Sequence, residues 1–210
     1  FCSNKTRERY INLANKLSEK GIATLRFDFG GSGESEKRAV TIETEVDDLR
    51  SAIALMKEEG FKNIGLLGES LGSIVSLKVY NDDIDAMVLW APVTKPKEPA
   101  ELKYKEREKE LKQNGYIIKH KDNTEFKIPQ QYFDERMSVD RDALFEDVDV
   151  PVLIIQGGKD DLIPLQHSEE AIEYLSKGSQ LEIINGAGHT MDEHMQEVIP
   201  KTAEWFINHL

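Results

Sequence analysis

Residues 64–72 of the chain read IGLLGESLG, and this stretch decides the fold class. Four largely apolar residues, Ile64–Leu67, are typical of a buried strand, and a helical pattern runs from Leu71 to Tyr80. The residues between them, GESLG, form a G-x-S-x-G sequence in the strand–turn–helix context of a nucleophile elbow. The elbow predicts that Ser70 projects above the carboxyl end of its strand as a nucleophile. It also predicts that the glycines at both flanks relieve a sharp turn, which strains the backbone of the serine.

Strand-like and helical segments alternate along the rest of the chain. Two amphipathic stretches, Thr6–Lys20 and Ile42–Glu59, are each followed by a glycine, as helices commonly are. Repeated strand–helix–strand units predict an α/β fold with a doubly wound, mostly parallel sheet. The expected strands are Ile22–Phe27, Ile64–Leu67, Ala86–Trp90, Val152–Ile155 and Leu181–Ile184.

One long insertion interrupts this alternation between Pro92 and about Asp140. The charged run Lys95–Lys112 is compatible with a helix, and Tyr116–Ile128 predicts a hairpin that turns near residues 122–123. A charge run is most often a solvated surface, but a long insertion can also cover a pocket. We therefore predict a core of residues 1–93 and 138–210 with a cap of residues 94–137. The candidate substrate contacts in the cap are Tyr116, Ile118, Phe126, Tyr132 and Phe133.

A serine hydroxyl needs a base to act as a nucleophile at neutral pH. His189 ends the sequence NGAGH (residues 185–189), directly after the last expected strand, and so reaches the same sheet edge as Ser70. An orienting carboxylate is expected after the strand Val152–Ile155, where Asp160 and Asp161 compete. Their side chains point in different directions, and position within the loop favours Asp160.

Composition restricts the classes of partner. The 210 residues include 39 acidic and 27 basic side chains, and the net charge of −12 disfavours nucleic acid. The lone Cys2 excludes an intramolecular disulfide and a cysteine-built zinc site. No apolar run approaches the ~18 residues of a membrane span. These features fit a single soluble domain in a reducing compartment, with the cytoplasm as the expected location and a homodimer left open.

Three motifs in a fixed order carry a family resemblance. The elbow, then G-x-x-D-x-x-I-P at residues 157–164, then G-A-G-H at residues 186–189 resemble the α/β-hydrolase superfamily. The layout, with its insertion, is most similar to small bacterial carboxylesterases of the cinnamoyl/feruloyl-esterase type. The resemblance implies Ser70 as nucleophile, His189 as base and Asp160 as orienting carboxylate, with no metal and no cofactor. One departure is Ser73, where many relatives have glycine.

The resemblance also implies an oxyanion hole built from the backbone N–H groups of Leu71 and Phe1. In the family, a His-Gly segment and about three strands precede the position that Phe1 resembles. The sequence therefore predicts that the natural polypeptide extends upstream of Phe1 by about 25–40 residues.

The leading hypothesis is a serine carboxylic-ester hydrolase that works through an acyl-enzyme. Its expected partners are small-molecule esters with small to medium acyl groups, aromatic ones among them. The alternatives are an acyltransferase, an amide or C–C bond hydrolase on the same triad, or a catalytically silent binding module that kept the fold.

Overall fold

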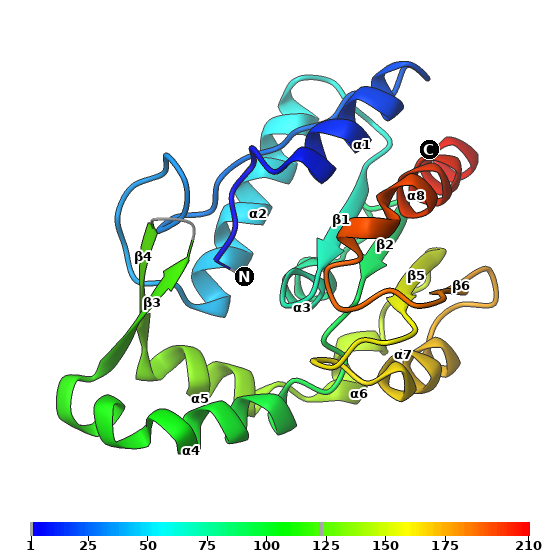
Figure 1. Cartoon of the computed structure of the whole chain (residues 1–210). Helices are drawn as coiled ribbons and strands as arrows, with labels where there is room; N and C mark the ends of the chain where they lie inside the picture. Colours follow the sequence, from blue (N-terminus) through cyan, green and yellow to red (C-terminus); the bar gives the residue numbers. More distant parts are fainter. Residues whose placement is uncertain (1, 122–123) are drawn as a thin grey trace.

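Four strands form one parallel sheet in the order β1-β2-β5-β6 in the computed structural model (Figure 1). The structure describes residues 2–121 and 124–210, without the side chains of residues 98 and 99. In register, Gly65 pairs with Ala86, Met87 with Val152, and Leu153 with Gln180. The strands are β1 (Gly65–Glu69), β2 (Ala86–Trp90), β5 (Val152–Gly157) and β6 (Gln180–Ile184).

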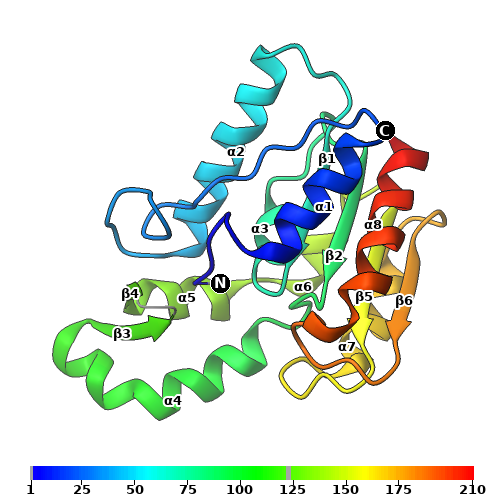
Figure 2. The same cartoon turned by 45° about the horizontal axis from the view of Figure 1, so that its top comes forward.

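Helices cover both faces of this sheet, because alternate strand residues pack in opposite directions (Figure 2). Met87 and Leu89 of β2 join a cluster with α2 (Ile42–Glu58) and α3 (Gly72–Lys78). Val88 and Trp90 join the opposite cluster with α1 (Glu8–Ser18) and α8 (Met195–His209). Every residue of β2 is buried. The predicted doubly wound α/β fold is confirmed.

Local sequence signals set the ends of helix α2. The Thr41 hydroxyl accepts a hydrogen bond from Thr44 N–H while the Thr44 hydroxyl accepts one from Thr41 N–H, which forms a capping box. At the other end Gly60 takes φ = +92°, a value that favours glycine, so the helix ends where the sequence predicted. The buried Val46 and Ile53 then face the sheet.

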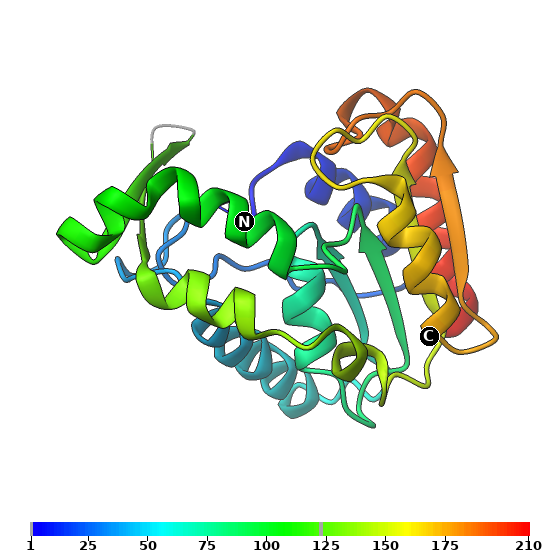
Figure 3. The ribbon, with the colours of Figure 1, turned by 90° about the horizontal axis from the view of Figure 1, so that it is seen from below.

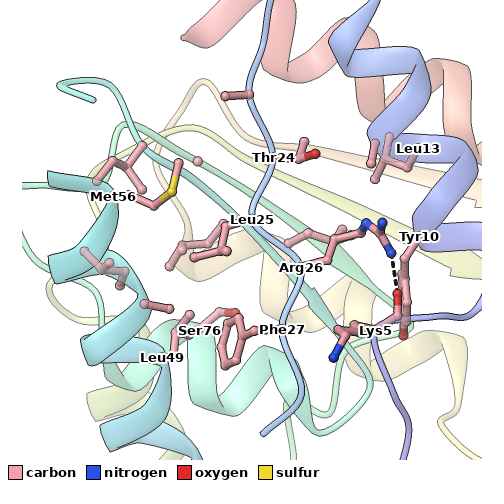
Figure 4. Close-up of a pocket in the computed structure, with 18 of the residues that line it drawn as sticks. Lys5, Tyr10, Leu13, Thr24, Leu25, Arg26, Phe27, Leu49, Met56 and Ser76 are labelled. Atoms are coloured by element: carbon pink, nitrogen blue, oxygen red, sulfur yellow. Dashed lines mark hydrogen bonds between the residues drawn. The ribbon is translucent and has the colours of Figure 1, made fainter. Parts of the chain in front are cut away.

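The prediction of a strand at Ile22–Phe27 is wrong, because this segment has no strand assignment. A strand needs a partner backbone about 4.8 Å away. A cavity of about 700 Å³ instead lies between this segment and the edge of β1. Figure 4 shows Leu25 and Phe27 at this cavity, with Leu49 and Met56 of α2. The apolar, β-prone residues indicated a buried strand, but residues 23–26 are exposed, and no strand in the described part of the chain lies within pairing distance of the segment.

The insertion lies between β2 and β5 and extends to one side of the sheet (Figure 3). Helix α4 ends at Gly115, which has φ = +75°, and a hairpin follows in which Tyr116 pairs with Pro129 and Lys121 with Thr124. The predicted turn at residues 122–123 lies outside the described residues. The elements are α4 (Lys97–Asn114), β3 (Tyr116–Lys121), β4 (Thr124–Pro129) and α5 (Gln130–Ser138).

Short helices complete the described chain. They are α6 (Arg141–Phe145), α7 (Leu165–Ala171) and the 3₁₀ turns η1 (Ile172–Tyr174) and η2 (Asp192–His194). Across residues 2–121 and 124–210, no helix is both long enough and apolar enough to cross a membrane.

Candidate active site

Three side chains from three loops meet at the carboxyl edge of the sheet. The Nε2 atom of His189 lies 3.0 Å from the Ser70 hydroxyl oxygen, and its Nδ1 atom lies 2.8 Å from Asp160 Oδ2. Ser70 follows β1, Asp160 follows β5 and His189 follows β6. The structure thus brings together the three residues that the sequence indicated. Hydrogen-bond contacts run from the Asp160 carboxylate through the His189 imidazole to the Ser70 hydroxyl.

The turn around Ser70 is as tight as an elbow requires. Ser70 has φ = +55°, which is rare for a residue with a side chain, and its N–H donates to Trp90 O at 2.8 Å. A Cβ atom on Gly68 would lie 2.8 Å from both Gly72 O and Ser76 Oγ, so only glycine fits there. A Cβ on Gly72 would meet nothing within 4 Å. The prediction that both glycines relieve a clash is therefore right for Gly68 and wrong for Gly72.

Ser73 has a larger role than the sequence indicated. Its fully buried hydroxyl donates to Ser70 O at 2.5 Å and accepts from Val93 N–H at 3.0 Å. The hydroxyl therefore links the strained elbow to the chain that leaves β2. Sequence reasoning treated Ser73 only as a small change in packing, since nothing local to the motif shows that Val93 lies beside it.

The carboxylate next to His189 belongs to Asp160, and Asp161 is exposed. Asp160 Oδ1 accepts hydrogen bonds from the N–H groups of Leu162 and Ile163 at 2.9 and 2.8 Å. Burial by itself raises the pKa of this carboxyl, but hydrogen bonds from His189, Ile163 and Leu162 outweigh it, so the pKa is lowered. Asp160 is thus held as an anion, the form that orients an imidazole and stabilises its protonated state.

Gln156 is a supporting residue that sequence reasoning missed. Its Nε2 donates to Asp160 Oδ2 at 2.8 Å and to Ile163 O at 3.2 Å, and its Oε1 accepts from the Ser168 hydroxyl at 2.9 Å. The side chain is fully buried. A signal was present, because a polar residue ends an otherwise apolar strand, and buried polar groups are almost always hydrogen-bonded.

The loop that carries His189 lies directly against the loop that carries Asp160. Lys159 N–H donates to Ala187 O at 2.8 Å, and Gly158 N–H donates to Ile184 O at 2.9 Å. A Cβ atom on Gly157 would collide with Gly188 O. Glycine at position 157 therefore permits the close approach that puts His189 and Asp160 in contact.

Comparison with known proteins gives this site a family. Residues 3–147 match the Hydrolase_4 family, described as serine aminopeptidase, S33. The chain belongs to this family. The matched residues contain the Ser70 elbow but end before Asp160 and His189. For these two residues, the evidence is the hydrogen-bond geometry described above.

A curated relative of this Hydrolase_4 member is an esterase. The chain is 24% identical over 240 residues to esterase EstD of Thermotoga maritima, an alignment that covers 94% of this chain and 56% of the relative. The chain therefore spans about half the length of that curated relative.

Solved structures show the same fold. A structure of Est1E from Butyrivibrio proteoclasticus with bound ferulic acid has a TM-score of 0.83 at 22% identity, covering 100% of this chain and 86% of that one. The monoacylglycerol lipase of Paleococcus ferrophilus has a TM-score of 0.79 at 19% identity, covering 99% and 92% of the two chains. These likenesses confirm the α/β-hydrolase fold.

A buried arginine joins the elbow to the histidine loop in this Hydrolase_4 chain. Arg9 of α1 lies 2.9 Å from Glu69 Oε1, next to Ser70, and donates to Thr190 O at 2.9 Å, next to His189. Tyr10 donates to the second Glu69 oxygen at 2.5 Å, and Asp192 also pairs with Arg9 at 3.0 Å. No sequence pattern indicates this bridge, because its members lie in separate parts of the chain.

Leu71 is the first of the two predicted oxyanion donors. Leu71 lies at the start of α3, and within the described residues no acceptor takes its N–H. Its donor is thus available beside the Ser70 hydroxyl. Phe1, the second predicted donor, lies outside the described residues.

Within the described residues, no group of three or more His, Cys, Asp or Glu side chains could hold a metal ion.

The candidate substrate residues of the insertion divide into two sets. Phe126, Tyr132 and Phe133 are buried in one cluster with Cys2. Tyr116 and Ile118 are only half-buried, and the strand alternation puts them on the hairpin face opposite Phe126. The first set is therefore part of the buried core, and the second set is not.

Proposed function

We propose that the protein is a serine hydrolase that cleaves carboxylic esters through an acyl-enzyme. The observation that carries this proposal is the continuous chain of hydrogen-bond contacts from Asp160 through His189 to Ser70. Membership of the Hydrolase_4 family and the likeness to esterase EstD support it.

Each residue has a defined role in this reaction. Ser70 Oγ attacks the ester carbonyl while His189 Nε2 accepts its proton, and the imidazolium then protonates the leaving alcohol. Water attacks the acyl-enzyme with the same histidine as base. Asp160 holds His189 Nδ1–H, and Gln156 holds Asp160. Leu71 N–H and Phe1 N–H stabilise the oxyanion.

We further propose that residues 94–137 act as a cap over the core of residues 1–93 and 138–210. The buried Phe126, Tyr132 and Phe133 then line the acyl side of the site and accept small to medium acyl groups, including aromatic ones. The ferulic acid in the Est1E structure supports an aromatic acyl group as a substrate feature.

Amide hydrolysis is the second candidate, because the family description names an aminopeptidase. The same triad serves both reactions. A direct comparison of an aminoacyl ester with the corresponding anilide separates them. The proposal expects the ester to have the far higher kcat/KM, and a preference for the anilide would favour the peptidase.

Labelling with a fluorophosphonate tests the nucleophile. The reagent should add one adduct to the wild-type protein, detected by intact mass, and none to Ser70→Ala, which should also lose ester turnover by several orders of magnitude. Ser51→Ala is a matched control, since Ser51 is an exposed serine on α2. Equal labelling of Ser70→Ala and wild type would exclude Ser70 as the nucleophile.

A further inference from the structure

Gln156 is a fully buried amide on a strand whose other side chains are apolar. Its neighbours Ile154 and Ile155 are also fully buried. An amide in such a place costs free energy unless each of its polar atoms has a partner, whereas a hydrocarbon side chain of the same length would fill the space without that cost. The partners of Gln156 therefore indicate what the amide does in this position.

Three hydrogen bonds fix the direction in which the amide faces. Gln156 Nε2 donates to Asp160 Oδ2 at 2.8 Å and to Ile163 O at 3.2 Å, while Oε1 accepts from the Ser168 hydroxyl at 2.9 Å. The two partners of Nε2 are oxygens that only accept, so a reversed amide would place its own oxygen against both of them. The Gln156 amide is therefore held in one orientation, with both hydrogens and the oxygen in use.

The amide and the loop that follows it form a closed hydrogen-bond network. Ile163 O accepts from Gln156, and Ile163 N–H donates back to Asp160 Oδ1 at 2.8 Å. Leu162 N–H donates to the same Oδ1 atom at 2.9 Å. The loop thus holds one oxygen of Asp160 with its own backbone, and Gln156 holds the other.

Oδ2 is the oxygen of Asp160 that matters for the imidazole. It lies 2.8 Å from His189 Nδ1, and within the described residues Gln156 is the other donor that reaches it. The Asp160 side chain is 0% exposed, so solvent is not in place to supply a substitute donor. A carboxylate held at one oxygen can still turn its second oxygen away, and the Gln156 donor opposes that rotation.

Helix α7 is the anchor of this amide. Ser168 is a fully buried residue of α7, and its hydroxyl holds the Gln156 oxygen on the side away from Asp160. The helix is itself fastened to other parts of the core. Glu170 pairs with Lys95 at 2.8 Å and with Arg141 at 3.0 Å, and the buried Thr94 hydroxyl donates to His167 O at 2.9 Å.

We propose that Gln156 and Ser168 are positioning residues, which tie the Asp160 carboxylate to α7 so that Oδ2 stays against His189 Nδ1. Both residues act on the reaction through Asp160. A rigid outer contact of this kind matters because a small misplacement of reacting groups lowers the rate strongly. This inference deepens the proposed ester hydrolase, and it rests on that function.

Gln156→Met tests the amide, since methionine keeps the length of the side chain and removes its hydrogen bonds. With 4-nitrophenyl butyrate as substrate, kcat should fall about tenfold while KM changes less than about threefold, because the buried amide reaches the reaction only through Asp160. Gln166→Met is the matched control. Gln166 is exposed on α7, and its amide also donates to a carboxylate, that of Glu170, at 2.8 Å. Unchanged kcat in Gln156→Met would overturn the proposal.

The Asp160→Ala background separates positioning from packing. Residual activity remains measurable there, because a triad that lacks one member still reacts faster than water. If Gln156 acts through Asp160, Gln156→Met should lower this residual kcat less than about twofold. The same tenfold loss in both backgrounds would mean that Gln156 supports the fold in general, and it would overturn the positioning role.

Ser168→Ala is a milder variant, which also serves if Gln156→Met does not fold. It removes the anchor on α7 and leaves both donors of Gln156 in place. We expect kcat to fall about threefold when Asp160 is present and not to fall in Asp160→Ala, as befits one neutral hydrogen bond. Wild-type kcat in Ser168→Ala would contradict the anchor.

The proposed reaction and the positioning role fail in different ways. If the wild-type protein hydrolyses esters and Gln156→Met keeps the full kcat, the ester hydrolase stands and the positioning role is wrong. If no ester is hydrolysed but a fluorophosphonate still labels Ser70, the proposed function is wrong. The rate of labelling then tests the positioning role, which expects Gln156→Met to react about tenfold more slowly only when Asp160 is present.

Discussion

Asp160 illustrates how much one residue depends on the donors around it. Its two carboxylate oxygens accept hydrogen bonds from Leu162 N–H, Ile163 N–H and the Gln156 amide, and one of them contacts His189. Every neighbour presents a hydrogen to it. Only a group that accepts at both oxygens fits this environment.

Asp160→Asn should therefore reduce kcat by about 10⁴, because the amide must turn its own hydrogens toward a donor or leave the imidazole in the wrong tautomer. Asp161→Asn should change kcat less than about twofold, since that carboxylate is exposed and away from His189. Steady-state kinetics on both variants checks this ranking. The reverse order would move the orienting role to Asp161.

Between elements, the geometry of the site depends on helix α1. Arg9 connects Glu69, beside Ser70, with Thr190, beside His189. Helix α1 therefore helps to hold Ser70 and His189 at their observed distance, in addition to the sheet strands that carry their loops. We expect Arg9 to act as a positioning residue.

Arg9→Met should lower kcat about tenfold through a longer serine–histidine distance, and it should also destabilise the fold because Glu69 loses its buried partner. The double variant Arg9→Met/Glu69→Gln removes that unpaired charge and should regain stability without regaining kcat. Urea unfolding and kinetics on both variants measure the two effects. Recovery of kcat in the double variant would show that Arg9 has a structural role only. Lys16→Met, an exposed lysine of the same helix, is the control.

Elements differ in how far the sequence could predict them. Helix α2 was predictable because Thr41 and Gly60 mark its ends locally. The segment Ile22–Phe27 was not, since β-prone residues become a strand only when another backbone pairs with them. The positions of Ser70, Asp160 and His189 followed from the rule that parallel strands end at one edge. Arg9 could not be assigned, because its contacts exist only after folding, whereas Gln156 had a signal in its polar side chain near the end of an apolar strand.

For the whole molecule, Glu45 links stability to pH. Its pKa is about 7 in the folded protein, above the ~4.3 of an unfolded chain, so folding favours the protonated form. Stability from this group is fully present below about pH 4 and is lost as pH rises toward 7.

Glu45→Gln should therefore be more stable than wild type at pH 8, by about 1–3 kcal/mol, and should differ far less at pH 5. Urea unfolding at the two pH values measures the difference. Glu58→Gln, an exposed position on the same helix, should show no such change. An equal effect of Glu45→Gln at both pH values would contradict the raised pKa.

The place of the insertion also bears on the order in which the molecule folds. Met87 of β2 pairs with Val152 of β5, so this contact must close a loop that contains all of α4, β3, β4 and α5. Closing a long loop costs entropy, whereas the β3–β4 hairpin pairs neighbouring segments and forms on a local timescale. Early folding of the hairpin would shorten the effective loop before β5 docks.

A nascent chain meets the same constraint. Ser70 is synthesised before the insertion, and Asp160 and His189 after it. Until β5 and β6 add to the sheet, Ser70 lacks its contact with His189. Recovery of the proposed esterase activity during refolding should then follow the docking of these last strands, and it should lag behind the helical signal of the segments that come first.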